Sequence, residues 1–168
     1  MRPLFQLLTL LFTAVLLASC SFHLRGKAGM PFDTLYLDAA NLNTPFTKEL
    51  RRDLEANKVK LVNTAGQADV VLSIVSEIPD KQILSLSGSG RVNEFQLFYR
   101  VSVRAYDLKK QDWIPAEEFV IHRDFPYDDN NVLAMEAEET LLYQSMRSDM
   151  VQQIVRRLSR AKPQPNSP

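Results

Sequence analysis

The chain has 168 residues, 45% of them hydrophobic and 24% charged, with 20 basic and 20 acidic side chains and no formal net charge. This composition is typical of one globular domain, and the lack of a basic excess argues against a nucleic-acid-binding protein. One cysteine and two histidines exclude an intramolecular disulfide, a zinc site built from several cysteines and a three-histidine metal site.

Residues 1–19 have the pattern of a secretory signal peptide. Arg2 precedes a segment, residues 7–18, that is apolar apart from two threonines. This segment is too short for a bilayer-spanning helix of about 20 residues, and it ends in small residues directly before Cys20. The box Leu17-Ala18-Ser19-Cys20 resembles the lipobox of bacterial lipoproteins, in which the signal is cut before the cysteine and the cysteine is acylated. The alternative interpretation is a buried N-terminal helix with a chance cysteine.

The lipobox predicts where the mature chain is held. Several acyl chains on Cys20 are enough for stable anchoring at a membrane surface, and this covalent lipid is the only non-protein group expected. Ser21 follows the cysteine, and by resemblance to the sorting rule of enteric bacteria a residue other than aspartate indicates the outer membrane. We therefore expect a protein anchored by its lipid to the periplasmic face of the outer membrane.

Four parts of the chain follow from composition and breaker residues. They are a signal peptide at 1–19, a lipidated tether at 20–31, an α/β domain at 32–160 and a proline-containing disordered tail at 161–168.

The first half of the domain predicts a strand, a helix and a second strand. Residues 34–38 have extended character, and Thr44 followed by Pro45 is the start pattern of a helix that ends near Asn57. One apolar stripe of that helix contains Phe46, Leu50 and Leu54. Residues 59–62 are expected to be extended. In the next strand, the period of two places Val70, Leu72, Ile74 and Ile78 on one face, with Pro79 at an edge or a bulge.

The second half predicts a hairpin, a further strand and a long helix. A turn at Ser87–Gly90 leads into a strand of strict alternation over residues 94–106, and Trp113–Phe125 returns as another strand. A helix is predicted from Val132 to Ser159. Its apolar stripe consists of Leu142, Met146, Met150, Ile154 and Leu158.

This order of elements predicts an α/β (α+β) two-layer sandwich. A four-stranded mixed sheet carries two amphipathic helices on one face, because the first helix can join parallel strands whereas tight hairpins make the later strands antiparallel. The other face of the sheet is then left without a helix, and this is where a binding surface is expected.

No catalytic set is visible, and the sequence predicts that the protein is not an enzyme. His122 has Arg123 and Asp124 as neighbours, but adjacent residues of a strand point to opposite faces, and a surface histidine is the simpler interpretation. The neighbouring acids at 117–118 and 128–129 lie in polar stretches, where carboxylates are solvated rather than paired for catalysis.

The uncovered face of the strand at 94–106 is a candidate interface. Phe98 and Tyr106 flank Arg100 and Arg104 there, and aromatic residues and arginine are enriched in interface hot spots. Arg91 follows the hairpin tip and Lys81 lies on the preceding strand, so these two are candidates for binding an anionic lipid headgroup. The alternative is an ordinary solvated sheet face, and the sequence leaves both interpretations open.

The heptapeptide Cys20-Ser21-Phe22-His23-Leu24-Arg25-Gly26 resembles the mature N-terminus of the LptE family, lipopolysaccharide-assembly lipoproteins of Gram-negative bacteria. Ser21 replaces the usual glycine. Residues 94–97 also resemble the family's Glu-Tyr-Gln-Leu start of a central strand, and the order of elements agrees.

This resemblance implies a plug inside the β-barrel LptD that binds lipopolysaccharide and helps assemble the barrel. The resemblance implies basic ligand contacts at the hairpin and near the start of the last helix. This sequence has Arg91 at the hairpin, but Met135 and Glu136 near the helix start supply no cation. The leading hypothesis is therefore a plug and helper of a lipopolysaccharide translocon. The alternatives are a general outer-membrane lipoprotein with a structural or cell-wall-binding role, and a periplasmic hydrolase on a lipid tether, which lacks a catalytic set.

Overall fold

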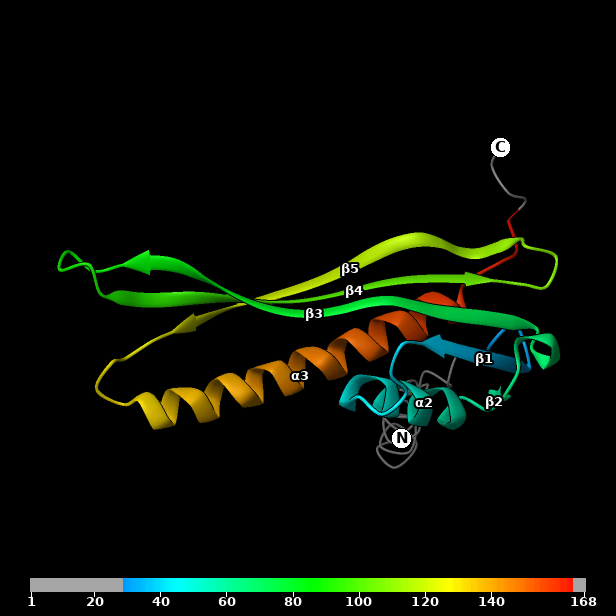
Figure 1. Ribbon diagram of the computed structural model, residues 1–168, viewed down its shortest axis with the longest axis horizontal. Coiled ribbons are helices and arrows are strands. Elements are labelled where there is room, and N and C mark those ends of the chain that lie inside the picture. The colour runs from blue at the N-terminus through cyan, green and yellow to red at the C-terminus, as the bar shows by residue number, and fades with distance from the viewer. Residues whose placement is uncertain (1–28, 165–168) are drawn as a thin grey trace, which may run out of the picture.

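The computed structural model describes residues 29–164, so the predicted signal peptide, Cys20 and the heptapeptide lie outside the described residues. The described elements, shown in Figure 1, are β1 (Thr34–Ala39), α2 (Pro45–Ala56), β2 (Lys60–Leu61), the 3-10 turn η1 (Ala65–Gln67), β3 (Val70–Leu86), β4 (Val92–Tyr106), β5 (Asp112–Pro126) and α3 (Val132–Ser159).

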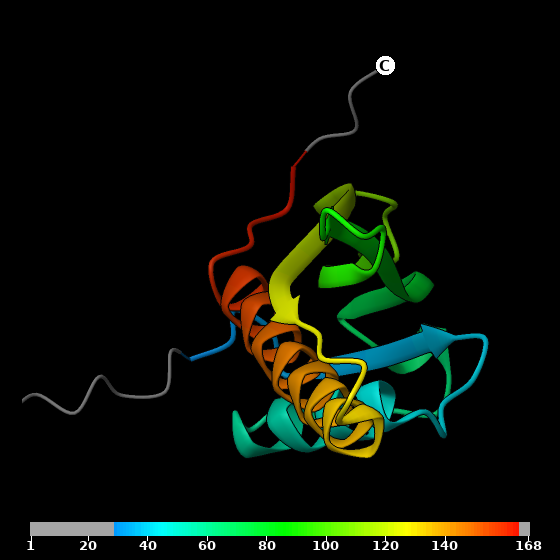
Figure 2. The same ribbon diagram turned by 90° about the vertical axis from the view of Figure 1, so that its left-hand side faces the viewer.

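The strands form one mixed sheet in the order β2-β1-β3-β4-β5. β1 pairs in parallel with β2 and β3, whereas the β3–β4 and β4–β5 pairs are antiparallel. Both helices lie on the same face of this sheet, as Figures 1 and 2 show. The predicted two-layer α+β sandwich with one uncovered face is therefore confirmed.

The sheet has five strands instead of the four predicted. The additional strand, β2, has two residues, and its pairing is seen in the bonds from the backbone N–H of Lys60 to the carbonyl of Asp33 (2.8 Å) and from Val62 to Leu35 (3.0 Å). The sequence predicted residues 59–62 to be extended but did not count them as a strand of the sheet, because two residues are too few to show a period of two. The place of β2 in the sheet depends on α2 returning the chain beside β1.

Helix α2 begins and packs as its sequence predicts. The side chain of Thr44 caps the helix by accepting a hydrogen bond from the backbone N–H of Thr47 (3.1 Å), and Pro45 occupies the first turn. The stripe of Phe46, Leu50 and Leu54 is fully buried. Asn57 is the C-cap, and its side-chain amide donates to the carbonyl of Asp53 (2.7 Å).

The prediction that Ile78 shares the buried face of β3 is wrong, because the strand contains a bulge. Val70, Leu72 and Ile74 are buried as expected, but Ile78 is 48% exposed. The register of β3 against β4 shifts between Ile74 and Ser76, so Val75 is an extra residue that exchanges the two faces of the strand after it. Beyond Ile74, β3 pairs only with β4, which confirms the predicted edge position of Pro79, a residue without an N–H to donate.

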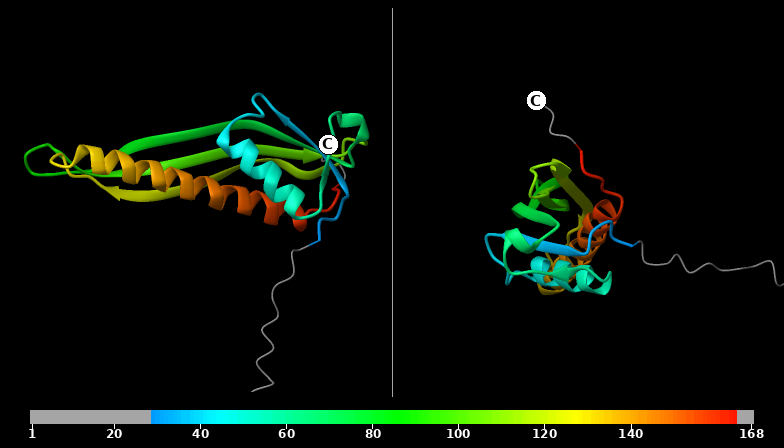
Figure 3. Two further views of the ribbon diagram at one scale, coloured as in Figure 1. Left: turned by 90° about the horizontal axis from the view of Figure 1, so that it is seen from below. Right: turned by 90° about the vertical axis from the view of Figure 1, so that its right-hand side faces the viewer.

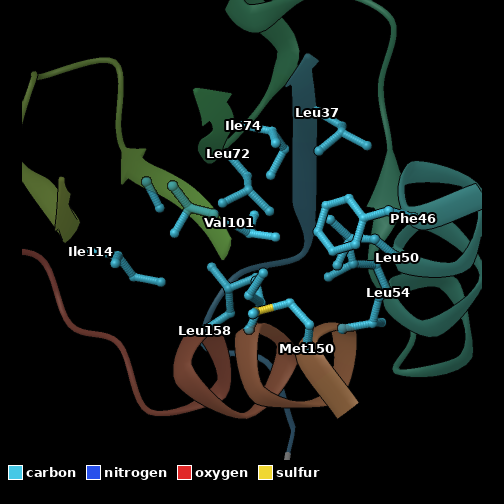
Figure 4. Close-up of a cluster of buried hydrophobic side chains, with 14 of the residues drawn as sticks. Leu37, Phe46, Leu50, Leu54, Leu72, Ile74, Val101, Ile114, Met150 and Leu158 are labelled. Atoms are coloured by element: carbon cyan, nitrogen blue, oxygen red, sulfur yellow. The ribbon is translucent and has the colours of Figure 1, made fainter. Parts of the chain in front are cut away.

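The core lies between the sheet and the two helices (Figure 4). The alternating residues of β4 meet the stripe of α3 there, and the largest of the fully buried side chains are Phe46, Phe125, Leu35, Leu50, Leu54, Leu72, Leu97, Ile114, Met146, Met150, Ile154 and Leu158. These side chains come from α2, α3 and four of the strands, so a single core holds the two layers together.

The packed chain extends beyond the predicted end of the domain. Ala161 is 2% exposed, and the backbone N–H of Gln164 donates to the carbonyl of Asp112 (2.8 Å), which forms an isolated β-bridge. The segment at 161–164 therefore packs along the edge of β5 instead of joining a disordered tail. Among residues 29–164, no helix is both long and apolar enough to cross a bilayer.

Candidate functional site

The uncovered sheet face holds the four predicted interface residues. Arg100 lies 4.6 Å from the centre of the Phe98 ring, and its guanidinium contacts the carboxylate of Asp80 at 3.3 Å. Hydrogen bonds from the side chain of Gln82 and from Arg100 lower the pKa of Asp80. The arginine thus lies over an aromatic ring, and its charge is already paired.

The second pair of interface residues repeats this arrangement. Arg104 donates from Nε to the carboxylate of Asp112 at 2.8 Å, and its guanidinium lies 5.3 Å from the centre of the Tyr106 ring. The hydrogen bond that Arg104 donates to Asp112 raises the pKa of Arg104. The sequence singled out both arginines as interface residues of an uncovered row, and in the structure each guanidinium has an acid partner on a neighbouring strand.

The surface around these pairs is mixed in character. In the register of the sheet, Arg100 lies between Ile78 on β3 and Val120 on β5, which are 48% and 44% exposed. Phe98 lies beside His122, with ring centres 6.2 Å apart. An uncovered face with apolar side chains and locally neutralised charges fits contact with a protein wall better than capture of a free anion.

Lys81 lies on the helix side of the sheet, not on the uncovered face. It pairs with Glu139 of α3 at 2.7 Å and lies 4.8 Å from the centre of the Phe95 ring. It borders a groove of about 600 Å³ between β3 and α3, which Tyr99 and Tyr143 also line. Burial raises the pKa of Tyr143 to about 12, with Glu139 and Asp80 adding to the rise.

Arg91 is not brought together with Lys81. It is exposed at the tip of the β3–β4 hairpin, where its backbone closes the turn with Ser87. Leu86, the partner of Val92, lies five positions after Lys81 in β3, so the two cations are about 17 Å apart along the strand. The two candidate headgroup contacts therefore form two separate positions.

The hairpin carries exposed apolar side chains that the sequence analysis missed. Ile83, Leu84 and Leu86 are 58%, 45% and 56% exposed, and Figure 1 shows that this hairpin projects beyond the start of α3. Leu133 in the first turn of α3 is 83% exposed. The sequence contains an indication of this apolar surface, because three large apolar residues stand next to a turn. The sequence analysis took them only as a sign of extended structure.

A second groove, of about 610 Å³, lies between α2 and α3. The cations on its walls are Lys48, Arg51 and Arg52 from α2 and Arg147 from α3, and Arg147 lies 3.5 Å from the carboxylate of Glu49. The sequence showed that the first three lie off the apolar stripe of their helix. It gave no indication that α3 would form a wall opposite them. Within the described part of the chain, no group of three or more potential metal ligands is present.

The sequence of the chain is similar to that of a known protein family. A family model described as LptE, lipopolysaccharide-assembly, matches residues 32–158. The chain belongs to the LptE family. The LPS-assembly lipoprotein LptE of Pectobacterium atrosepticum is 30% identical over 94% of this chain and 86% of its own length. Its counterpart in Yersinia pestis strain Pestoides F is 31% identical over 91% of this chain and 75% of its own length.

Solved structures share the fold of this LptE-family protein. A lipoprotein B from Nitrosomonas europaea has a TM-score of 0.71 at 38% identity, covering 83% of this chain and 90% of that one. The rare lipoprotein B from Shewanella oneidensis has a TM-score of 0.67 at 27% identity over 74% of this chain and 92% of that one. The resemblance drawn from the heptapeptide is therefore confirmed by matches that extend over most of the chain. The individual site residues of the LptE-family protein stay predictions.

Proposed function

We propose that this protein is a lipid-anchored component of lipopolysaccharide assembly at the outer membrane. In this role it seats in the β-barrel LptD, assists the folding of that barrel and contacts lipopolysaccharide on its way to the outer leaflet. The observation that carries the proposal is the family match over residues 32–158, together with relatives named LPS-assembly lipoprotein LptE. Acylation of Cys20 and attachment at the periplasmic face of the outer membrane belong to the same proposal.

The uncovered face of the sheet supports seating against a barrel wall. Phe98, Arg100, Arg104 and Tyr106 form a row whose charges are already paired, so a protein wall can cover it without leaving an isolated charge. Ile78 and Val120 supply apolar area on either side of this row.

The far end of the molecule supports contact with lipopolysaccharide. Lipid A combines phosphates with acyl chains, so a protein that binds it needs cations beside apolar surface. Arg91 adjoins the exposed Leu84 and Leu86 at the hairpin tip. Lys81 borders the groove between β3 and α3 and supplies a cation beside the start of α3, where the sequence of the helix itself offers none.

The test is affinity purification of the acylated protein from detergent-solubilised outer membrane. Co-purification of one large β-barrel supports the proposal, and recovery without any barrel overturns it. Replacing Arg100 and Arg104 together by glutamate places two unpaired acids on the uncovered face and is expected to reduce barrel recovery with unchanged secondary structure. Lys109→Glu in the β4–β5 turn is the matched control, because it is an exposed cation outside that row.

The hairpin contact is tested separately with purified lipopolysaccharide. Arg91→Glu is expected to weaken binding of the lipid by at least about tenfold, since one charge-assisted contact contributes about 1.5–3 kcal/mol. Barrel recovery should stay as in the wild type. Lipid binding equal to that of the wild type would remove Arg91 from the proposed site.

A further inference from the structure

The unpaired cations of the described chain are unevenly distributed. Six of the described lysines and arginines form ion pairs within the chain. Eight of those without an ion pair to another described residue are exposed on α2, on β2 and its flanks, or at the end of α3. We call this set the basic face; it consists of Lys48, Arg51, Arg52, Lys58, Lys60, Arg156, Arg160 and Lys162.

Backbone and ring contacts bring these segments to one end of the molecule. Lys60 donates its N–H to the carbonyl of Asp33, the Phe32 ring packs against that of Trp113 at 5.7 Å, and Gln164 bonds to Asp112. The first described residues therefore lie beside β2 and beside the segment that carries Lys162. Figures 2 and 3 show the ends of α2 and α3 on the side of the domain where the first described residues lie.

Acidic side chains do not neutralise the basic face. Residues 150–164 contain no aspartate or glutamate. On α2 the acids are Glu49, which is paired with Arg147, and Asp53 and Glu55. Asp33 lies beside β2, and the carboxylate of Asp69 accepts from the backbone N–H groups of Asp33 and Thr34. The balance on this face is clearly positive, in a chain whose total formal charge is zero.

The opposite end of the molecule is acidic. The β5–α3 loop and the first turns of α3 carry Asp128, Asp129, Glu136 and Glu138, none of which forms an ion pair with a described residue. Arg91 is the one cation near this end that lacks an ion pair within residues 29–164. The charge of the domain is therefore polarised along its long axis, with the positive end where the N-terminal segment joins.

The length of the N-terminal connection determines what this positive end can reach. Gly29 lies nine positions after Cys20 in the chain, and nine steps from one residue to the next span at most about 32 Å whatever the conformation. If the lipid on Cys20 is in the bilayer, the end of the domain beside Gly29 is kept within that distance of the headgroups. Basic side chains are attracted to an anionic leaflet within a Debye length, about 8 Å at physiological salt, so the tether allows contact.

We infer that the basic face docks on the anionic phospholipid headgroups of the leaflet that holds the lipid anchor. This rests on the proposed lipid anchor and gives the orientation of the anchored protein while it is free of the barrel in which we propose that it seats. The domain lies with α2 and the end of α3 against the headgroups, and its acidic end points away because the same surface potential repels it. The groove lined by Lys48, Arg51 and Arg52 is the part of this face best shaped to accept a headgroup phosphate.

The experiment measures which lysines become shielded on vesicles. Acylated full-length mature protein is added to preformed vesicles of phosphatidylcholine alone, or of equal amounts of phosphatidylcholine and phosphatidylglycerol. A membrane-impermeant amine-reactive ester then labels exposed lysines, which are quantified by mass spectrometry. Each basic side chain favours the docked orientation about fivefold on an anionic surface. We expect labelling of Lys58 and Lys60 to slow markedly only on the anionic vesicles.

Lys81 provides the internal control. Its side chain is 37% exposed and pairs with Glu139 near the start of α3, toward the acidic end, so it should label equally on both vesicles. Replacing Arg51 and Arg52 by glutamate should lower the ratio of docked to undocked protein at least about 25-fold and speed the labelling of Lys58. Raising the salt to about 1 M, where the Debye length is about 3 Å, should do the same.

The outcomes separate this inference from the proposed anchor. One outcome overturns the docking but agrees with the proposed anchor. In it, the mass of the protein shows intact acylation, the protein is retained on both vesicles, and Lys58 is labelled equally on the two lipids. Equal shielding of Lys58 and Lys81 also overturns it, because it indicates burial without orientation. A chain that carries no acyl mass and does not float with vesicles contradicts the proposed anchor instead.

Discussion

A hydrogen bond beneath the bulge of β3 offers the sharpest test of how the two layers are joined. The hydroxyl of Tyr99 donates to a carboxylate oxygen of Glu77 at 2.6 Å, and the other oxygen of Glu77 accepts from the hydroxyl of Thr44 at 3.1 Å. This connects β4 and β3 to the N-cap of α2. Burial and the hydrogen bond to Glu77 raise the pKa of Tyr99 well above its usual value, so the phenol stays protonated and remains a donor.

The perturbation is Tyr99→Phe, which removes one oxygen from a ring that is 4% exposed. A hydrogen bond to a charged group contributes about 1.5–3 kcal/mol, and we expect about 2 kcal/mol because Glu77 is half-buried and water can partly replace the phenol. That loss corresponds to a roughly 30-fold smaller folding constant and to a melting temperature lower by about 6–10 °C.

The assay is equilibrium urea unfolding followed by circular dichroism, with the slope m checked for constancy. Tyr106→Phe is the matched control, since the hydroxyl of Tyr106 makes no hydrogen bond to another described residue and its removal should change stability by less than about 0.5 kcal/mol. A Tyr99→Phe variant as stable as this control would refute the reasoning that Glu77 joins the layers.

Three further predictions concern the core, a loop and the anchor. Met150→Ala should lower the free energy of unfolding by about 2–5 kcal/mol, because Met150 is fully buried; calorimetry checks this. Hydrogen bonds from Thr34 depress the pKa of Asp69 below 3.8, so its stabilising effect is present at neutral pH and is lost as the pH falls through the depressed pKa. Asp69→Asn should therefore be less stable than wild type near pH 7, with a difference that shrinks in acid unfolding titrations. Cys20→Ala should abolish metabolic acyl labelling, and labelling equal to wild type would contradict the lipobox.

Local pattern was sufficient to predict most elements. The helix at 132–159 was predicted with the bounds found, because five apolar residues spaced by four define one face of a helix whatever it packs against. Thr44 and Pro45 marked the start of α2, since capping depends only on residues within one turn. The strict alternation of β4 likewise predicted which of its side chains are buried.

The candidate site was predictable only in part. The sequence placed Phe98, Arg100, Arg104 and Tyr106 in one row, because they alternate on a single strand. It could not show that Arg100 meets Asp80, which lies twenty residues earlier and becomes its neighbour only in the register of the hairpin. It also grouped Lys81 with Arg91, whereas the structure places them on different surfaces.

The sequence by itself determined the periodic elements and the family. Periodic elements depend on residues that are near neighbours in the chain, and family motifs are defined by the order of residues alone. The tertiary structure decided the bulge at Val75, the pairing of β2 and the gathering of Arg51, Lys60 and Lys162 on one basic face. One inserted residue exchanges the faces of every residue after it, and charge clustering depends on how distant segments return to one surface. Both the bulge and the charge clustering result from long-range packing, and the spacing of residues within one element cannot predict them.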